Sequence, residues 1–135
     1  MHNYLPILAI FTLATGYGLW YRRSRGAVKA KDRGNRLSNQ DLGGELGSRV
    51  TLVQFSSAFC TPCRATRALL TDITADLTDV RHIEIDAESN LELVRRLDIR
   101  STPTTLILNS EGAEVGRAVG APKRADVLAT LASIK

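Results

Sequence analysis

Two cysteines three positions apart, Cys60 and Cys63, are the residues of this sequence best suited to chemistry. The run before them is apolar and β-branched like a buried strand, and helical periodicity begins at Pro62. The amides and dipole of a helix N-terminus stabilise a thiolate, which is the species that attacks disulfides. The pattern therefore predicts thiol–disulfide exchange, in which Cys60 attacks the substrate and Cys63, one turn further on, resolves the mixed disulfide.

Two other interpretations of the cysteine pair are a zinc site and an inert disulfide. Zinc in proteins takes about four nitrogen or sulfur ligands, and outside this pair the chain offers no Cys and only His2 and His82. We therefore expect no metal. A disulfide that closes so small a loop constrains few residues and adds little stability, so an inert structural role is also disfavoured.

Composition limits the remaining function classes. The 135 residues suffice for one domain with an appendage, which excludes a multidomain enzyme. The net charge of +4 resides in residues 22–36, which carry +6, whereas residues 37–135 carry −2. Only Phe55 and Phe59 are aromatic beyond residue 21. The domain therefore lacks the basic surface and the aromatic platform of a nucleic-acid-binding protein, and we expect no nucleic acid partner.

An apolar segment without charges runs from Tyr4 to Tyr21. As a helix its eighteen residues span about 27 Å, close to the thickness of a bilayer core. Tyr4 at one end and Trp20 with Tyr21 at the other suit the two headgroup levels. We predict a transmembrane anchor over residues 1–21, a flexible basic tether over residues 22–36 and a folded domain over residues 37–135.

A cleaved signal peptide is the alternative to an anchor, but a signal peptide carries its basic residues before the apolar run, and here they follow it. The positive-inside rule then keeps the basic flank cytoplasmic. The sequence predicts a single-pass membrane protein with its N-terminus outside and its domain in the cytoplasm.

The sequence of the domain predicts strands that alternate with helices. Strands are expected over residues 50–56, 80–86, 104–108 and 114–119, the last two forming an antiparallel pair. Helices are expected from Ser38 for a turn or two, from Pro62 for about four turns, over residues 91–97, and from Pro122 to the end. This βαβαββα order predicts an α/β fold, a mixed sheet covered by helices on both faces.

Residues 37–135 resemble the thioredoxin family. The resemblance rests on four features: the strand-then-CTPC-then-helix segment, Ile85-Asp86 at a strand end, Ser101-Thr102-Pro103-Thr104 before a strand, and Val119-Gly120-Ala121 before the last helix. It implies a cis-proline at Pro103 beside the dithiol and a Thr102 backbone that pairs with an extended substrate segment. Phe59, Thr61 and Pro62 would complete the substrate-binding surface.

The chain departs from the thioredoxin pattern at several positions. Gln54 stands where the family has a buried Asp under the dithiol, and an amide cannot accept the Cys63 proton. Phe59, Thr61 and Thr102 replace the usual Trp, Gly and Ile, and the first strand is missing or much shortened. One hypothesis is that His82 or Glu84, acting through water, is the proton acceptor; the alternative is that both face solvent or cap polar neighbours.

The function expected from the sequence is a membrane-tethered protein disulfide reductase that binds no cofactor. The resemblance implies that an NADPH-dependent thioredoxin reductase supplies electrons, so NADPH acts only through this partner. One alternative is an extracytoplasmic exchange protein, either an apocytochrome reductant or a disulfide oxidant. Another is a thioredoxin-fold module that binds proteins without turnover.

Overall fold

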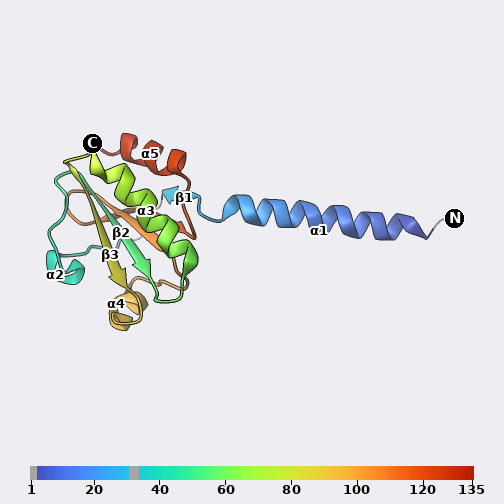
Figure 1. The fold of residues 1–135 in the computed structure, drawn as a ribbon, viewed down its shortest axis with the longest axis horizontal. Coiled ribbons are helices and arrows are strands. Elements are labelled where there is room, and N and C mark those ends of the chain that lie inside the picture. The colour runs from blue at the N-terminus through green and yellow to red at the C-terminus, as the bar shows by residue number, and fades with distance from the viewer. Residues whose placement is uncertain (1–2, 31–33) are drawn as a thin grey trace.

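The computed structural model describes residues 3–30 and 34–135, in which one long helix precedes an α/β domain. Its elements are α1 (Tyr4–Ser24), β1 (Val28–Ala30), α2 (Asn39–Leu42), β2 (Val50–Ser56), α3 (Thr61–Ala75), β3 (Val80–Asp86), α4 (Leu91–Arg96), β4 (Thr104–Leu108), β5 (Glu114–Val119) and α5 (Arg124–Ser133). Figure 1 shows α1 extending away from the domain as a separate rod. His2 and residues 31–33, which took part in the predictions above, lie outside the described residues.

The five strands form one mixed sheet in the order β1-β5-β4-β2-β3. β2 and β3 are parallel, and the other neighbouring pairs are antiparallel. All seven residues of β2 are buried, because this strand lies inside the sheet and is covered on both faces. The predicted mixed sheet is confirmed, including the antiparallel pairing of β4 with β5.

Helices cover both faces of the sheet (Figure 1), and each face has its own apolar cluster. Successive side chains of a strand point to opposite faces, so β2 contributes to both clusters. On the face covered by α2 and α4, Val53 and Phe55 pack with Leu97. On the face covered by α3 and α5, Leu52 packs with Leu70. Full burial of one such side chain stabilises a fold by about 1.5–3 kcal/mol.

The segment between α1 and the domain differs from the prediction made for it. We predicted a flexible tether over residues 22–36, but α1 continues to Ser24 and residues 28–30 form β1, which pairs with β5. Arg36 also forms a β-bridge with Ala113. β1 was not predicted because it is three residues long, lies among charged residues in the sequence, and pairs with β5 far along the chain. The part of the predicted tether that the structure describes is therefore mostly ordered against the domain.

The last helix begins two residues later than predicted. We expected Pro122 at its first position, but α5 starts at Arg124, and Lys123 has an extended conformation. Ala121 and Pro122 pack instead against Gly26, where an added Cβ would lie 2.1 Å from the Ala121 carbonyl oxygen. This contact with the N-terminal segment places Pro122 in the connection before the helix.

Candidate functional site

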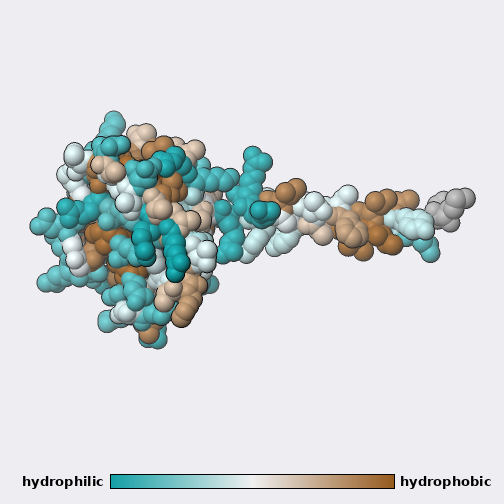
Figure 2. All heavy atoms as spheres, viewed as in Figure 1, coloured by the Kyte–Doolittle hydropathy of each residue, from teal (hydrophilic) through white to brown (hydrophobic). Residues whose placement is uncertain are grey.

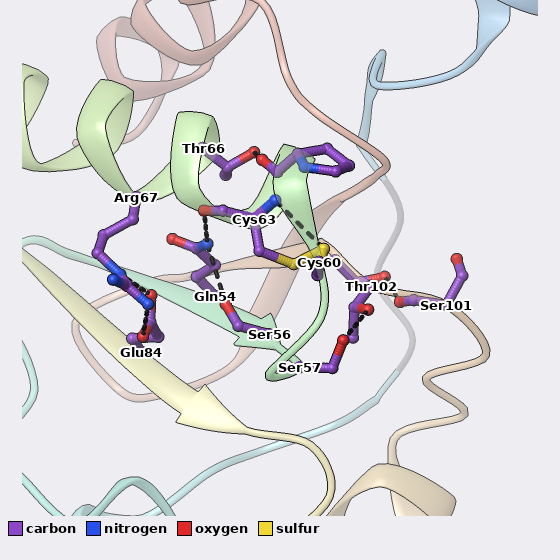
Figure 3. Close-up of a disulfide and its surroundings, with 12 residues drawn as sticks. Gln54, Ser56, Ser57, Cys60, Cys63, Thr66, Arg67, Glu84, Ser101 and Thr102 are labelled. Atoms are coloured by element: carbon purple, nitrogen blue, oxygen red, sulfur yellow. Dashed lines mark hydrogen bonds and ion pairs between the residues drawn. A yellow bond between two sulfur atoms is a disulfide. The ribbon is translucent and has the colours of Figure 1, made fainter.

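The two cysteines lie where β2 ends and α3 begins, and they form a disulfide with a Cα–Cα distance of 5.2 Å. Cys60 is the N-cap of α3, and its sulfur accepts a hydrogen bond from the Cys63 backbone N–H at 3.2 Å. Figure 3 shows this contact at the start of the helix. Once the disulfide is reduced, this N–H and the helix dipole favour a thiolate at Cys60.

The two cysteine residues differ in their exposure to solvent. Cys60 is partly exposed, whereas Cys63 is only 2% exposed and faces the interior. Only Cys60 is therefore presented to a large molecule that approaches from outside. This asymmetry fits the predicted division between an attacking and a resolving cysteine.

A second loop meets the disulfide from the start of β4. The Thr102–Pro103 peptide bond is cis, as the resemblance implies. The Thr102 hydroxyl lies 3.0 Å from the Ser57 hydroxyl, in the loop that leads to Cys60, and Figure 3 shows this pair beside the disulfide. The Gly120 N–H donates to the Pro103 carbonyl at 2.8 Å. Three loops, following β2, preceding β4 and following β5, thus meet at one end of the sheet.

The residues predicted to contact substrate lie in or beside these loops. Phe59 is 100% exposed, and Thr61 and Pro62 are exposed as well. Thr102 is half-buried, and Pro103 is buried. The structure therefore brings the predicted set to one surface, where Phe59 presents a large apolar ring without any covering side chain.

Gln54 lies fully buried on β2 beneath Cys63. Its amide nitrogen donates to the Cys63 carbonyl at 2.9 Å and to the Ser56 hydroxyl at 3.0 Å. Its carbonyl oxygen lies 3.0 Å from Nε2 of His82. Both ends of the amide are thus hydrogen-bonded, which fixes its orientation without placing a charge beside the sulfurs.

His82 and Glu84, the two candidate proton acceptors, have different partners. The Gln54 carbonyl oxygen can only accept, so Nε2 of His82 donates to it. Burial lowers the pKa of His82, and the charge of Glu84 partly opposes this shift. Glu84 instead accepts two hydrogen bonds from the Arg67 guanidinium, at 2.5 and 2.7 Å. His82 is therefore connected to the cluster beneath Cys63, and Glu84 faces Arg67.

Ser56 and Ser57 also belong to the site, although they were not predicted from the sequence. Each is bonded to a predicted position, Ser56 to Gln54 and Ser57 to Thr102. Their position at the end of a buried strand and shortly before Cys60 could have predicted this, because side chains in that stretch can reach the dithiol. Among residues 3–30 and 34–135, no three His, Cys, Asp or Glu side chains are grouped so that they could hold a metal ion.

Comparison with known proteins places this site in a family. The thioredoxin family model matches residues 37–133. The chain belongs to the thioredoxin family. The thioredoxin of Mycolicibacterium smegmatis is 36% identical over 87 residues, which are 62% of this chain and 77% of the relative. Rice thioredoxin H2-1 is 30% identical over 76 residues, which are 56% of this chain.

The chain spans about half the length of the rice relatives, 54% of thioredoxin H2-1 and 53% of thioredoxin H5. Among solved structures, thioredoxin NaTrxh of Nicotiana alata has a TM-score of 0.58 and 27% identity; the match covers 64% of this chain and 73% of that one. Residues 22–36, which include β1, lie outside the part matched by the family model.

Proposed function

We propose that this chain reduces protein disulfides through a dithiol cycle of Cys60 and Cys63. The observation that carries the proposal is the partly exposed residue Cys60 at the N-cap of α3, beside a buried Cys63. The Cys60 thiolate attacks a substrate disulfide and forms a mixed disulfide, while the other substrate sulfur leaves and takes up a proton. Cys63 then attacks Cys60, which releases the second substrate thiol and re-forms the disulfide. Two electrons pass from the dithiol to the substrate in each cycle.

The cycle requires no cofactor bound to this chain. An NADPH-dependent thioredoxin reductase is the proposed electron donor, and it would reduce the Cys60–Cys63 disulfide by the reverse exchange. Extended segments of the substrate would pair with the Thr102 backbone, next to the exposed Phe59 ring. This arrangement is supported by family membership and by the position of Thr102, whose hydroxyl lies 3.0 Å from that of Ser57 in the loop leading to Cys60.

We further propose that His82 takes up the Cys63 proton, through water, during resolution. Gln54 cannot take the proton, and the lowered pKa of His82 keeps its ring neutral near pH 7. Because Nε2 donates to Gln54, the free lone pair is on Nδ1. His82→Gln retains a donor toward Gln54 but has no base, so we expect slower resolution in stopped-flow measurements. Glu84→Gln is the control; an unchanged rate in His82→Gln would contradict this role.

We also propose that α1 anchors the chain in a membrane with the domain in the cytoplasm. By length and composition α1 can cross a bilayer, and every described side chain of its apolar part is exposed or half-buried. Arg22 and Arg23 in its last turn favour the cytoplasmic side. A removed signal sequence is the alternative, and N-terminal sequencing of the mature protein distinguishes the two.

Cysteine substitutions test the activity. With full-length protein in detergent micelles and insulin as a model disulfide, we expect Cys60→Ser to abolish reduction. Cys63→Ser should accumulate a covalent complex through Cys60, visible on a non-reducing gel. Complex formation by Cys60→Ser instead would reverse the proposed roles. Retention of biological function by Cys60→Ser would favour a binding module without turnover.

Labelling tests the orientation. After mild reduction of intact cells, a membrane-impermeant thiol reagent should label Cys60 only when the cells are lysed. Labelling without lysis would place the dithiol outside the cytoplasm and would favour extracytoplasmic exchange. N-terminal sequencing of the same sample distinguishes an uncleaved anchor from a removed signal peptide.

A further inference from the structure

The end of α1 and the disulfide lie at the same end of the sheet. β1 begins at Val28, which pairs with Ala118 near the end of β5. The next residue, Val119, pairs with Thr104 at the start of β4, and Thr104 pairs with Phe55 near the end of β2. The chain enters β1 and leaves β2 toward Cys60 at this end of the sheet. The start of β1 and the end of β2 are three strand spacings apart, about 14 Å.

The connection between α1 and the sheet leaves little freedom. The Arg25 N–H donates to the Tyr21 carbonyl at 3.2 Å, and the Arg25 guanidinium lies 5.5 Å from the centre of the Tyr21 ring. The next residue, Gly26, donates its N–H to the Val119 carbonyl at 2.7 Å. Arg25 is thus bound to the helix and Gly26 to the sheet. The three residues 25–27 reach at most about 11 Å even when fully extended.

The loop that receives Gly26 also borders the redox site. Gly26 has φ +80° and packs so closely on Ala121 that a Cβ would lie 2.1 Å from its carbonyl oxygen. Gly120, between these contacts, donates to the Pro103 carbonyl next to the disulfide. One short loop therefore contacts the α1 junction on one side and the cis-proline on the other.

Basic side chains surround the junction on the side of the helix. Arg22 and Arg23 line a shallow groove together with Leu19 and Lys123, which precedes α5. Figure 2 shows the largely apolar surface of α1 changing to hydrophilic side chains where it meets the domain. Each basic residue near an anionic leaflet contributes about 1 kcal/mol of attraction. This end of the domain is thus suited to contact lipid headgroups.

We propose that the preferred substrates are disulfides close to the bilayer surface, carried by other membrane-anchored proteins. This inference rests on the proposed function, because it requires α1 to span a membrane and the dithiol to reduce disulfides. With the junction fixed, the start of β1 stays about three strand spacings from the end of β2 that leads to Cys60, so the disulfide remains at the end of the domain nearest α1 and cannot reach far into solution. A substrate anchored in the same bilayer encounters the dithiol at a high effective concentration. A bulky soluble protein collides with the bilayer before its disulfide can reach Cys60.

Single turnovers in vesicles test this preference. Full-length protein in vesicles with anionic lipid is reduced, freed of reductant and mixed with either of two probes. One is a transmembrane peptide with a disulfide next to its membrane end, and the other is the same peptide without its transmembrane part. In the variant, about twelve Gly and Ser residues separate Arg25 from Gly26, with an average span of about 19 Å. We expect the ratio of the anchored to the soluble rate to fall about tenfold in this variant.

The control carries the same residues appended after Lys135, which lengthens the chain without separating α1 from the domain. Its rate ratio should equal that of the natural chain. A ratio near one in the natural chain would overturn the proposed preference, and the same high ratio in all three proteins would overturn its dependence on the fixed junction; both leave disulfide reduction intact. Failure of the natural chain to reduce either probe would instead overturn the proposed function. Reduction of the soluble probe by the linker variant shows that the variant is folded and active.

Discussion

The two faces of the sheet each bury one polar cluster, and the two clusters differ in charge. On the face under α3, the Gln54 amide is hydrogen-bonded to Cys63, Ser56 and His82, and these hydrogen bonds include no ion pair. On the opposite face, the side chains of Glu114 and Arg117 on β5 form an ion pair that is 0% and 5% exposed. Strand β4 lies between β5, which carries the ion pair, and β2, which carries Gln54.

The ion pair is held by many hydrogen bonds. Arg117 donates twice to Glu114 at 2.8 Å and also to the carbonyls of Leu97 and Asp98, after α4. Asn35 donates to Glu114 at 2.9 Å. Removing two charges from water is costly, and only such complete bonding offsets that cost. This cluster joins β5, the loop after α4 and the segment before α2, which is a structural role.

The neutral cluster suits a different task. Beneath a sulfur that must change between thiol, thiolate and disulfide, a permanent buried charge would favour one state. Gln54 supplies fixed hydrogen bonds without charge, and His82 is the titratable group bonded to it. The fold thus buries a permanent ionic pair where it only needs rigidity, and places an amide and an imidazole next to the chemistry.

Breaking the ion pair should have the largest effect on stability. Arg117→Ala leaves the Glu114 carboxylate buried without its guanidinium, so we expect a loss of about 3–5 kcal/mol in the free energy of unfolding. Urea denaturation of the oxidised full-length protein measures it. A double variant, Glu114→Leu with Arg117→Met, removes both charges and should recover much of the loss. A loss near zero in Arg117→Ala would show that the pair does not hold β5 to the loop after α4.

Removing the amide from the neutral cluster should cost less. Gln54→Leu leaves the His82 donor and the Cys63 carbonyl without this partner, and we expect a loss of about 1–3 kcal/mol by the same denaturation measurement. Ser56→Ala removes a single contact of the same amide and is the matched control, with a smaller loss. A loss as large as that of Arg117→Ala would contradict the distinction drawn between the two faces.

His82 also makes the stability of the neutral cluster depend on pH. Burial lowers the pKa of folded His82 below its unfolded value, so the unfolded chain binds the proton first as the pH falls. Stability from this residue is complete above the unfolded pKa of about 6.5 and is lost as the pH falls through the folded value. The slope is at most about 1.4 kcal/mol per pH unit. His82→Gln should flatten the stability profile below pH 6.5; an identical slope would contradict burial of a neutral ring.

The smallest effect is expected at the surface ion pair beside the neutral cluster. Arg67 and Glu84 are bonded at 2.5 and 2.7 Å, but the Arg67 side chain is 54% exposed. Exposed pairs contribute little because water and salt screen them. Arg67→Ala should leave the denaturation midpoint nearly unchanged at high salt. A clear loss that persists in high salt would show that Arg67 stabilises the redox end in another way.

The elements of the domain were largely predictable because local patterns encode them. β2 to β5 occupy the residue ranges predicted for them, since apolar and β-branched runs bounded by turn residues are local signals. The CTPC motif marked the strand-to-helix turn, and Cys60 is the N-cap there. β1 and the late start of α5 were missed, because both depend on contacts between residues 26–30 and residues 116–122.

Local sequence patterns are enough to predict the dithiol, its place at a helix N-terminus, the apolar α1 segment and the βαβαββα order. These follow from residue types and spacings within a few turns of chain. The tertiary structure decided which polar group supports which: His82 with Gln54, Glu84 with Arg67, and Glu114 with Arg117. It also decided that Gly26 packs beside the redox loop. Such pairings arise from strand order and register, which bring together residues that no local pattern connects.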